Sequence, residues 1–208
     1  MIRLMIVDDH PLIRLGLHQI LDPIEDIEIA AEADSGVQAL RLLEQQTFDL
    51  IVLDMAMPGR SGVEILRRIC DDKQAPPVLI YSRFPADQYA ERTLRAGAAG
   101  YVVKSAAPNE LVHAIRSLAA GRRHLPPGVP GTAAAGGRTR HDQLSEREFE
   151  VLRLIVGGHS VTAIANALSL SIKTVSTHRT RILRKLALTS TADLVHYAIE
   201  HGIDDHSA

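Results

Sequence analysis

The sequence predicts an α/β domain built on a five-stranded, doubly wound parallel sheet, followed by a smaller all-α domain. Two observations lead to this prediction. Strand-like apolar runs alternate with helical patterns as far as about residue 120, which is typical of successive βα units. After residue 143 every segment has helical periodicity, and a stretch rich in proline, glycine and alanine separates the two parts.

The first half of the chain alternates regularly between the two kinds of segment. We expect strands near residues 2–8, 27–33, 49–54, 77–82 and 100–103, and helices near 11–21, 36–46, 61–71, 86–96 and 107–120. Ser35 and Ser61 stand where helix N-caps are needed, and Gly97 and Gly121 stand just beyond two helix ends. These signals favour five βα units with helices on both faces of the sheet.

Changes in composition divide the chain into three parts. Residues 1–120 are expected to form the first domain, residues 121–143 a flexible linker, and residues 144–208 the second domain. Ser145 and Glu148 have the spacing of a capping box at the start of a helix. Further helices are expected at 162–168, 172–186 and about 190–201. A short helix, a tight turn and a cationic second helix are typical of a helix-turn-helix.

The net charge of −2 hides an uneven distribution. Residues 1–118 contain 17 acidic and 12 basic side chains. Residues 151–192 contain no acidic side chain, and their cations are Arg153, Lys173, Arg179, Arg181, Arg184 and Lys185. An acidic first domain is therefore expected, with a second domain that prefers an anion such as DNA.

Composition also argues against several classes of protein. The N-terminus carries no cationic, apolar leader and no apolar run reaches the ~20 residues of a membrane helix, so a soluble cytoplasmic protein without a membrane partner is expected. Cys70 stands alone, which excludes an intrachain disulfide. Aromatic residues make up only 3% and tryptophan is absent, which argues against a site built mainly on aromatic stacking.

Polar residues follow several predicted strands at the point where each strand ends. Asp8 and Asp9 follow the first strand, Asp54 the third, Ser82 the fourth and Lys104 the fifth. Parallel strands bring these ends to one edge of the sheet, where open α/β folds bind ligands. Carboxylates are ligands that Mg²⁺ prefers, and the central Asp54 is the expected nucleophile towards a phosphoryl group. Lys104 is expected to neutralise phosphoryl oxygens, and Ser82 to donate a hydrogen bond to one of them.

Residues 2–118 resemble the receiver domain of two-component response regulators, which has a flavodoxin-like fold. The landmarks are Val7-Asp8-Asp9-His10-Pro11, Leu53-Asp54-Met55-Ala56-Met57-Pro58-Gly59 with Ser61-Gly62, Ser82, and Tyr101-Val102-Val103-Lys104. The resemblance implies that Asp54 accepts the phosphoryl group from a sensor histidine kinase. It also implies that Mg²⁺ is bound by Asp8, Asp9, Asp54 and the carbonyl of Ala56.

The same resemblance implies a switch pair. The Ser82 hydroxyl moves towards the phosphate and the Tyr101 ring follows inward, so that phosphorylation biases a two-state surface. Arg83 departs from the family pattern, because the residue after the switch hydroxyl is usually small. Its position beside the phosphate site leads to the hypothesis that Arg83 shields the acyl phosphate, slowing its hydrolysis or restricting small phosphodonors.

The cationic helix expected at 172–186 has the features of a DNA-reading helix, since its N-terminus offers free N–H groups to a phosphate. Short hydroxyls can approach base edges and a guanidinium can reach a guanine or a phosphate. The side chains expected in these roles are Ser176, Thr177, Arg179 and Thr180. The cations expected to bind phosphates are Lys173, Arg181, Arg184 and Lys185, and Thr174 fits either role. The expected core-facing side chains are Ile172, Val175, Ile182, Leu183 and Leu186.

Residues 144–201 look like a LuxR-type helix-turn-helix. The landmarks are Leu144 to Glu148, Glu150 to Leu152, Ile164-Ala165, Leu168, Ser171 to Val175, His178-Arg179 and Lys185-Leu186. Together with the first domain, the chain resembles the NarL/FixJ class of response regulators. This implies a transcription regulator that binds double-stranded DNA as a homodimer, with RNA polymerase as a further candidate partner. Val161-Thr162-Ala163 departs from the family pattern, which puts phosphate contacts near residue 162 in doubt.

Other functions compete with this interpretation. The main alternative is a phosphorylation-independent DNA-binding regulator whose receiver is a fixed dimerisation module. A phosphatase that starts from Asp54 is disfavoured, because no second aspartate stands two residues later and no capping domain encloses a substrate. A small-molecule sensor is disfavoured by the scattered aromatic residues. We therefore expect a regulator that turns over no external substrate and is not an enzyme.

Overall fold

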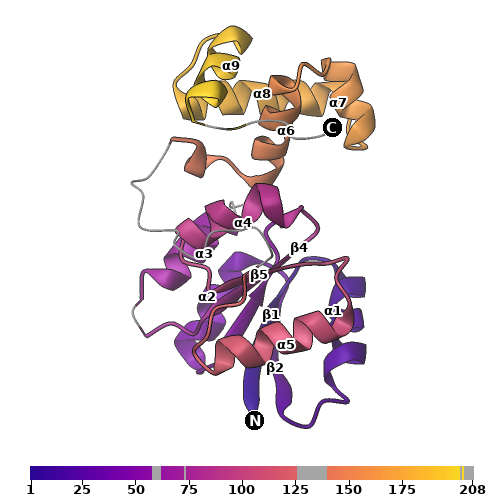
Figure 1. Ribbon diagram of the computed structural model, residues 1–208, viewed down its shortest axis with the longest axis vertical. Coiled ribbons are helices and arrows are strands. Elements are labelled where there is room, and N and C mark those ends of the chain that lie inside the picture. Colours follow the sequence, from indigo (N-terminus) through magenta and orange to yellow (C-terminus); the bar gives the residue numbers. More distant parts are fainter. Residues whose placement is uncertain (58–61, 73, 126–139, 202, 204–208) are drawn as a thin grey trace. The chain divides into compact units, whose positions relative to one another are not determined.

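A computed structural model of the chain describes residues 1–57, 62–72, 74–125, 140–201 and 203 (Figure 1). The chain divides into two compact units, Met1–Gly137 and Arg138–Ala208. Within the described residues, no helix combines the length and apolar character needed to cross a membrane.

The first unit contains a five-stranded, all-parallel sheet with the strand order β2-β1-β3-β4-β5. The strands are β1 (Ile2–Val7), β2 (Ile27–Ala33), β3 (Leu50–Leu53), β4 (Val78–Ser82) and β5 (Gly100–Val103). This confirms the predicted sheet, and each strand lies within one residue of its expected bounds. Every residue of β3 is buried. The strand pairs with β1 on one side and β4 on the other, so its carboxyl end lies between two neighbouring strands.

Five helices connect and follow the strands. They are α1 (Pro11–Leu21), α2 (Gly36–Gln45), α3 (Gly62–Cys70), α4 (Ala86–Arg95) and α5 (Pro108–Ala119). The Ser35 hydroxyl accepts a hydrogen bond from the Gln38 amide, as expected of an N-cap. Gly97 and Gly121 have φ angles of 113° and 74°, which explains glycine just beyond these helix ends. The N-cap expected at Ser61 lies outside the described residues.

The core is continuous on one face of the sheet, where α1 and α5 cover it (Figure 1). Alternate strand residues such as Leu4, Ile6, Leu50 and Val52 belong to this cluster. The intervening residues on the same strands are also buried, and the two-residue repeat of a strand places them on the opposite face. A sheet that is covered on both faces exposes functional groups only at its edges and ends.

The chain just after α5 pairs with the edge strand β5. The Tyr101 amide donates a hydrogen bond to the His124 carbonyl at 3.2 Å, and the His124 amide donates to the Ala99 carbonyl at 3.4 Å. Gly100 forms an isolated parallel bridge with His124, and a Cβ at Gly100 would lie 2.9 Å from the His124 carbonyl oxygen. The start of the segment expected to be a linker is therefore attached to the sheet.

The second unit consists of helices. They are the 3₁₀ helix η1 (Arg140–Gln143), then α6 (Glu146–Val156), α7 (Val161–Ala167), α8 (Ile172–Leu186) and α9 (Thr191–Glu200). The helical segments expected from residue 144 onward are all present, whereas η1 was not anticipated. Four serines cap the four α-helices, each accepting a backbone hydrogen bond: Ser145, Ser160, Ser171 and Ser190.

A buried carboxylate ties the start of α6 to α8. Glu148 completes the predicted capping box, since one of its oxygens accepts a hydrogen bond from the Ser145 amide at 2.8 Å. The same oxygen lies 2.6 Å from the Lys185 ammonium, which also donates to the Gln143 carbonyl at 3.0 Å. Burial raises the pKa of Glu148, but the bonds from Lys185 and Ser145 outweigh burial and hold it below its usual value.

We expect Glu148→Gln to lower the free energy of unfolding at neutral pH by about 1–3 kcal/mol, because a charge-assisted bond to Lys185 is lost. The folded-state pKa of Glu148 is depressed, so its contribution is present above the unfolded pKa and is lost as the pH falls through the folded pKa. The difference between variant and wild type should therefore shrink on acidification. Urea denaturation of the full chain at several pH values measures it. Glu150→Gln on the same helix is the control, and an equal difference at every pH would contradict the assignment.

Candidate functional site

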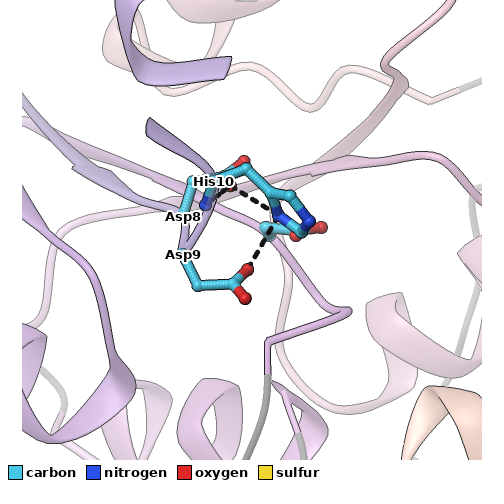
Figure 2. Close-up of side chains that lie close together, drawn as sticks. Asp8, Asp9 and His10 are labelled. Carbon is cyan, nitrogen blue, oxygen red and sulfur yellow. Dashed lines mark hydrogen bonds and ion pairs between the residues drawn. The ribbon is translucent and has the colours of Figure 1, made fainter. Parts of the chain in front are cut away.

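An acidic pocket lies at the carboxyl ends of β1 and β3. Asp8, Asp9 and His10 follow β1 and Asp54 follows β3, and each offers a ligand atom that lies within 4.8 Å of the others. Asp8 and Asp54 are each only 2% exposed. Figure 2 shows the Asp9 carboxylate and the His10 ring on the loop that leaves β1. The strands thus bring together the three carboxylates that the sequence placed at one edge.

Lys104, at the end of β5, supplies the positive charge of this pocket. Its ammonium lies 2.6 Å from a carboxylate oxygen of Asp8 and 3.1 Å from one of Asp54. Burial raises the pKa of Asp54, Lys104 lowers it, Asp8 raises it again, and the net shift is upward. Both Asp54 oxygens are buried, and the contacts with Lys104 and with the Ala56 backbone, which lower the pKa, do not outweigh that burial. A carboxylate in this situation favours a cation or an added phosphoryl group.

The donor atoms fit the preference of Mg²⁺ for oxygen ligands. Three carboxylates converge, and one Asp9 oxygen and both Asp54 oxygens are buried. Ala56 follows Asp54 by two residues and is partly buried. Its carbonyl stays a predicted ligand. Residues 58–61, part of the sequence landmark, lie outside the described residues.

Arg14 anchors the loop that carries Asp8 and Asp9. The sequence analysis did not identify this role of Arg14. Its guanidinium donates to the Asp8 carbonyl at 2.7 Å and to Glu32 at 2.7 Å. The other Glu32 oxygen lies 2.7 Å from the His18 ring, and the His18 bond is the main cause of the lowered pKa of Glu32. Arg14 and His18 are four residues apart on α1, a spacing that places them on one helix face.

The predicted switch residues are joined through the backbone of Phe84. The Phe84 amide donates to the buried Ser82 hydroxyl at 3.3 Å, and the Tyr101 hydroxyl donates to the Phe84 carbonyl at 2.9 Å. Tyr101 is 1% exposed, so its ring lies inside the protein. The guanidinium of Arg83 lies 5.3 Å from the centre of the Phe84 ring, and the side chain is exposed. Shielding of the phosphate site by Arg83 stays a prediction.

The cationic helix α8 presents its predicted DNA-binding residues unequally to solvent. The exposed ones are Lys173, Ser176, Thr177, Thr180, Arg181 and Arg184, and the partly exposed ones are Thr174, Arg179 and Lys185. Val175, Ile182 and Leu186 are buried as expected. The expectation for Ile172 was wrong: it is 55% exposed, at the first position of α8, whereas the first buried side chain of the helix is Val175.

Several of these side chains already have partners on the helix or in its own unit. The Thr177 and Thr180 hydroxyls donate to carbonyls four residues earlier, at 2.9 Å and 3.0 Å. Arg179 donates twice to the Thr191 hydroxyl, which fixes its guanidinium at the start of α9. Lys185 is bound to Glu148. The phosphate contact expected of Lys185 stays a prediction.

Two family models match the chain. The model for the response regulator receiver domain matches residues 4–116, and that for bacterial regulatory proteins of the luxR family matches residues 142–198. Among curated proteins, the response regulator GacA of Pseudomonas aeruginosa is 36% identical to this chain. That alignment covers 99% of both proteins.

Solved structures of RcsB resemble the chain over nearly its whole length. RcsB from Salmonella enterica serovar Typhimurium, bound to promoter rprA in the presence of phosphomimetic beryllofluoride, aligns with a TM-score of 0.57 and 27% identity. The alignment covers 95% of this chain and 98% of that one. A structure of two RcsB dimers bound to two parallel DNAs aligns with a TM-score of 0.58, 26% identity and the same coverage.

We expect Arg14→Ala to weaken divalent-cation binding about tenfold, because the Asp8 carbonyl loses the guanidinium that fixes its loop. Isothermal titration calorimetry with Mg²⁺ measures the change. Arg41→Ala, an exposed arginine on α2, is the matched control and should bind as the wild type does. An Arg14→Ala affinity equal to that of the control would show that the pocket holds its shape without this bond.

Proposed function

Because the chain belongs to the response regulators with a luxR-family DNA-binding domain, we propose that Asp54 is its phosphoacceptor and that a sensor histidine kinase controls DNA binding through it. The observation that carries this assignment is the Asp54 carboxylate itself. It is 2% exposed, its pKa is raised above the usual value chiefly by burial, and it lies 3.1 Å from the Lys104 ammonium.

In this proposal each polar group of the pocket has a separate task. An Asp54 oxygen attacks phosphorus, an O–P bond forms, and the bond between phosphorus and the donor nitrogen of the kinase histidine breaks. Lys104 offsets the charge of the phosphoryl oxygens, and Ser82 donates its hydroxyl to one of them. Asp8, Asp9, Asp54 and the Ala56 carbonyl hold Mg²⁺, which supplies neutralising charge when bound.

The switch acts through Phe84. A Ser82 hydroxyl that turns towards a phosphoryl oxygen leaves the Phe84 amide, and the Phe84 carbonyl is the acceptor of the Tyr101 hydroxyl. The backbone of Tyr101 also pairs with His124, at the start of the segment that leaves the first unit. Hydrogen bonds thus connect the Ser82 hydroxyl to β5 and to the chain that follows α5.

On DNA we propose that α8 enters the major groove. Ser176, Thr177, Arg179 and Thr180 approach base edges, and Thr174 contacts a base or a phosphate. Lys173, Arg181 and Arg184 bind phosphates, while Lys185 supports the helix through Glu148. A homodimer binds two half-sites, as the RcsB dimers on DNA suggest, and RNA polymerase is a further proposed partner.

One observation favours a second candidate, a regulator that does not depend on phosphorylation. The Tyr101 ring already lies inside, with its hydroxyl bonded to Phe84. A receiver held in this state by Phe84 would serve as a fixed dimerisation module.

Beryllofluoride with Mg²⁺ separates the two candidates. We expect the wild type to change from monomer to dimer in sedimentation and to gain about 5–150-fold in DNA affinity. Asp54→Ala should show neither change, because the acceptor oxygens are gone, while Asp34→Asn, exposed outside the pocket, should behave as the wild type does. Equal mass and affinity with and without beryllofluoride would favour the fixed module.

For the DNA interface, Lys173→Ala and Lys185→Ala are a matched pair of charge removals on α8. Lys173→Ala should reduce the slope of log affinity against log salt concentration by about one, because one phosphate contact is lost. Lys185→Ala should leave the slope unchanged and lower the melting temperature instead, because Glu148 loses its partner. Fluorescence anisotropy on operator DNA at several salt concentrations, with thermal denaturation beside it, checks both. A reduced slope for Lys185→Ala would reverse its assigned role.

A further inference from the structure

Ile172 is a large apolar side chain exposed at the start of α8, whose other exposed side chains are polar. It is 55% exposed, and Val175, three residues later, is the first buried side chain of the helix. The proposed function assigns no role to Ile172. A single exposed isoleucine is common on protein surfaces, so its neighbours on the helix decide whether it has one.

Ile172 continues a row of side chains that the proposed function places at base edges. Residues four apart in an α-helix lie one above the other on the same face, so Ile172, Ser176 and Thr180 form one row. All three are exposed. Side chains of a helix tilt towards its N-terminus, so Ile172 extends this row beyond the first turn of α8. In a helix-turn-helix the N-terminal residues of the recognition helix contact base edges.

The threonines of α8 already use their hydroxyl groups within the helix and its cap. Thr177 and Thr180 donate theirs to carbonyls four residues earlier, at 2.9 Å and 3.0 Å. The Thr174 hydroxyl oxygen lies 2.7 Å from that of the N-cap Ser171. A threonine whose O–H is engaged offers its methyl group and oxygen lone pairs to a partner outside the helix. The outer face of α8 therefore has more apolar character, and fewer free O–H donors, than its sequence indicates.

The charges around this row suit a nucleic acid. Residues 151–192 contain no acidic side chain, and Lys173, Arg181 and Arg184 are exposed on the same helix. Among the four bases, thymine presents a methyl group in the major groove, and apolar side chains recognise it by direct contact. An apolar side chain surrounded by cations therefore complements a thymine that is flanked by phosphates.

We propose that Ile172 is a specificity-determining residue that reads the C5-methyl group of one thymine in each half-site. This inference rests on the proposed function, because it requires α8 to lie in the major groove. Contact between the side chain and the methyl group removes apolar surface of both partners from water, which is the source of the preference. The contact supplies sequence information, whereas cations that bind phosphates supply affinity alone.

The probe is duplex DNA with randomised half-sites, from which the full chain selects its sites with and without beryllofluoride. Each thymine of the selected site is then replaced by deoxyuridine, which removes the C5-methyl group and leaves base pairing intact. Fluorescence anisotropy gives the ratio of thymine to uracil affinity at each position. The variants are Ile172→Ala and Ile172→Val. The matched control is Ile199→Ala, which truncates another exposed isoleucine of the same unit, on α9.

We expect one thymine in each half-site at which deoxyuridine weakens wild-type binding about fourfold, the effect of one buried methyl group. Ile172→Ala should bind thymine and uracil equally at that position, and Ile172→Val, which keeps most of the apolar side chain, should retain a preference. Ile199→Ala should keep the wild-type ratio whatever its overall affinity. Ile172→Ala should also melt as the wild type does, because the side chain that it truncates is exposed.

A selected site at which deoxyuridine changes nothing would overturn the inference. An Ile172→Ala variant that keeps the wild-type ratio at every thymine would overturn it as well. Neither result contradicts the proposed function, because the wild type would still have selected and bound a duplex. A full chain that selects no duplex under either condition would overturn the proposed function, and this inference with it.

Discussion

The Lys104 ammonium holds together a pocket that would otherwise be unstable. Asp8 and Asp54 are both almost fully buried, and two carboxylates at this depth repel each other and lose hydration. One ammonium 2.6 Å and 3.1 Å from them offsets part of that cost, and the raised pKa of Asp54 shows that the offset is incomplete. The remaining imbalance is the physical reason for proposing that the pocket binds a cation. The same ammonium is in place to meet the charge of a phosphoryl group.

The fold fixes the strands that carry this pocket and connects the pocket to Tyr101 by hydrogen bonds. β1, β3 and β5 end in its charged residues, and buried side chains on both faces fix those strands. Arg14 secures the loop after β1 by its bond to the Asp8 carbonyl. Phe84 connects the Ser82 hydroxyl to Tyr101 with one backbone group on each side. Hydrogen bonds therefore join Ser82 to β5 through the backbone of Phe84.

In the second unit, contacts with neighbouring helices hold the cationic helix α8 in position. Lys185 and Arg179 are held by Glu148 and Thr191, on α6 and α9. Serine caps satisfy backbone amides at the start of each α-helix, including α8. The exposed cations of α8 are accessible to an anion, whereas Lys185 and Arg179 hold α8 against α6 and α9.

The sequence by itself determined the sheet, the α-helices and the set of charged residues at the strand ends. Apolar periodicity and capping serines are local signals, and parallel strands necessarily bring their carboxyl ends to one edge. Only the tertiary structure decided which groups bond. The contacts of Lys185 with Glu148 and of Tyr101 with Phe84 join residues 37 and 17 positions apart, and no local pattern encodes them. The exposure of Ile172 has the same origin, because the buried side of a helix depends on where its neighbours pack.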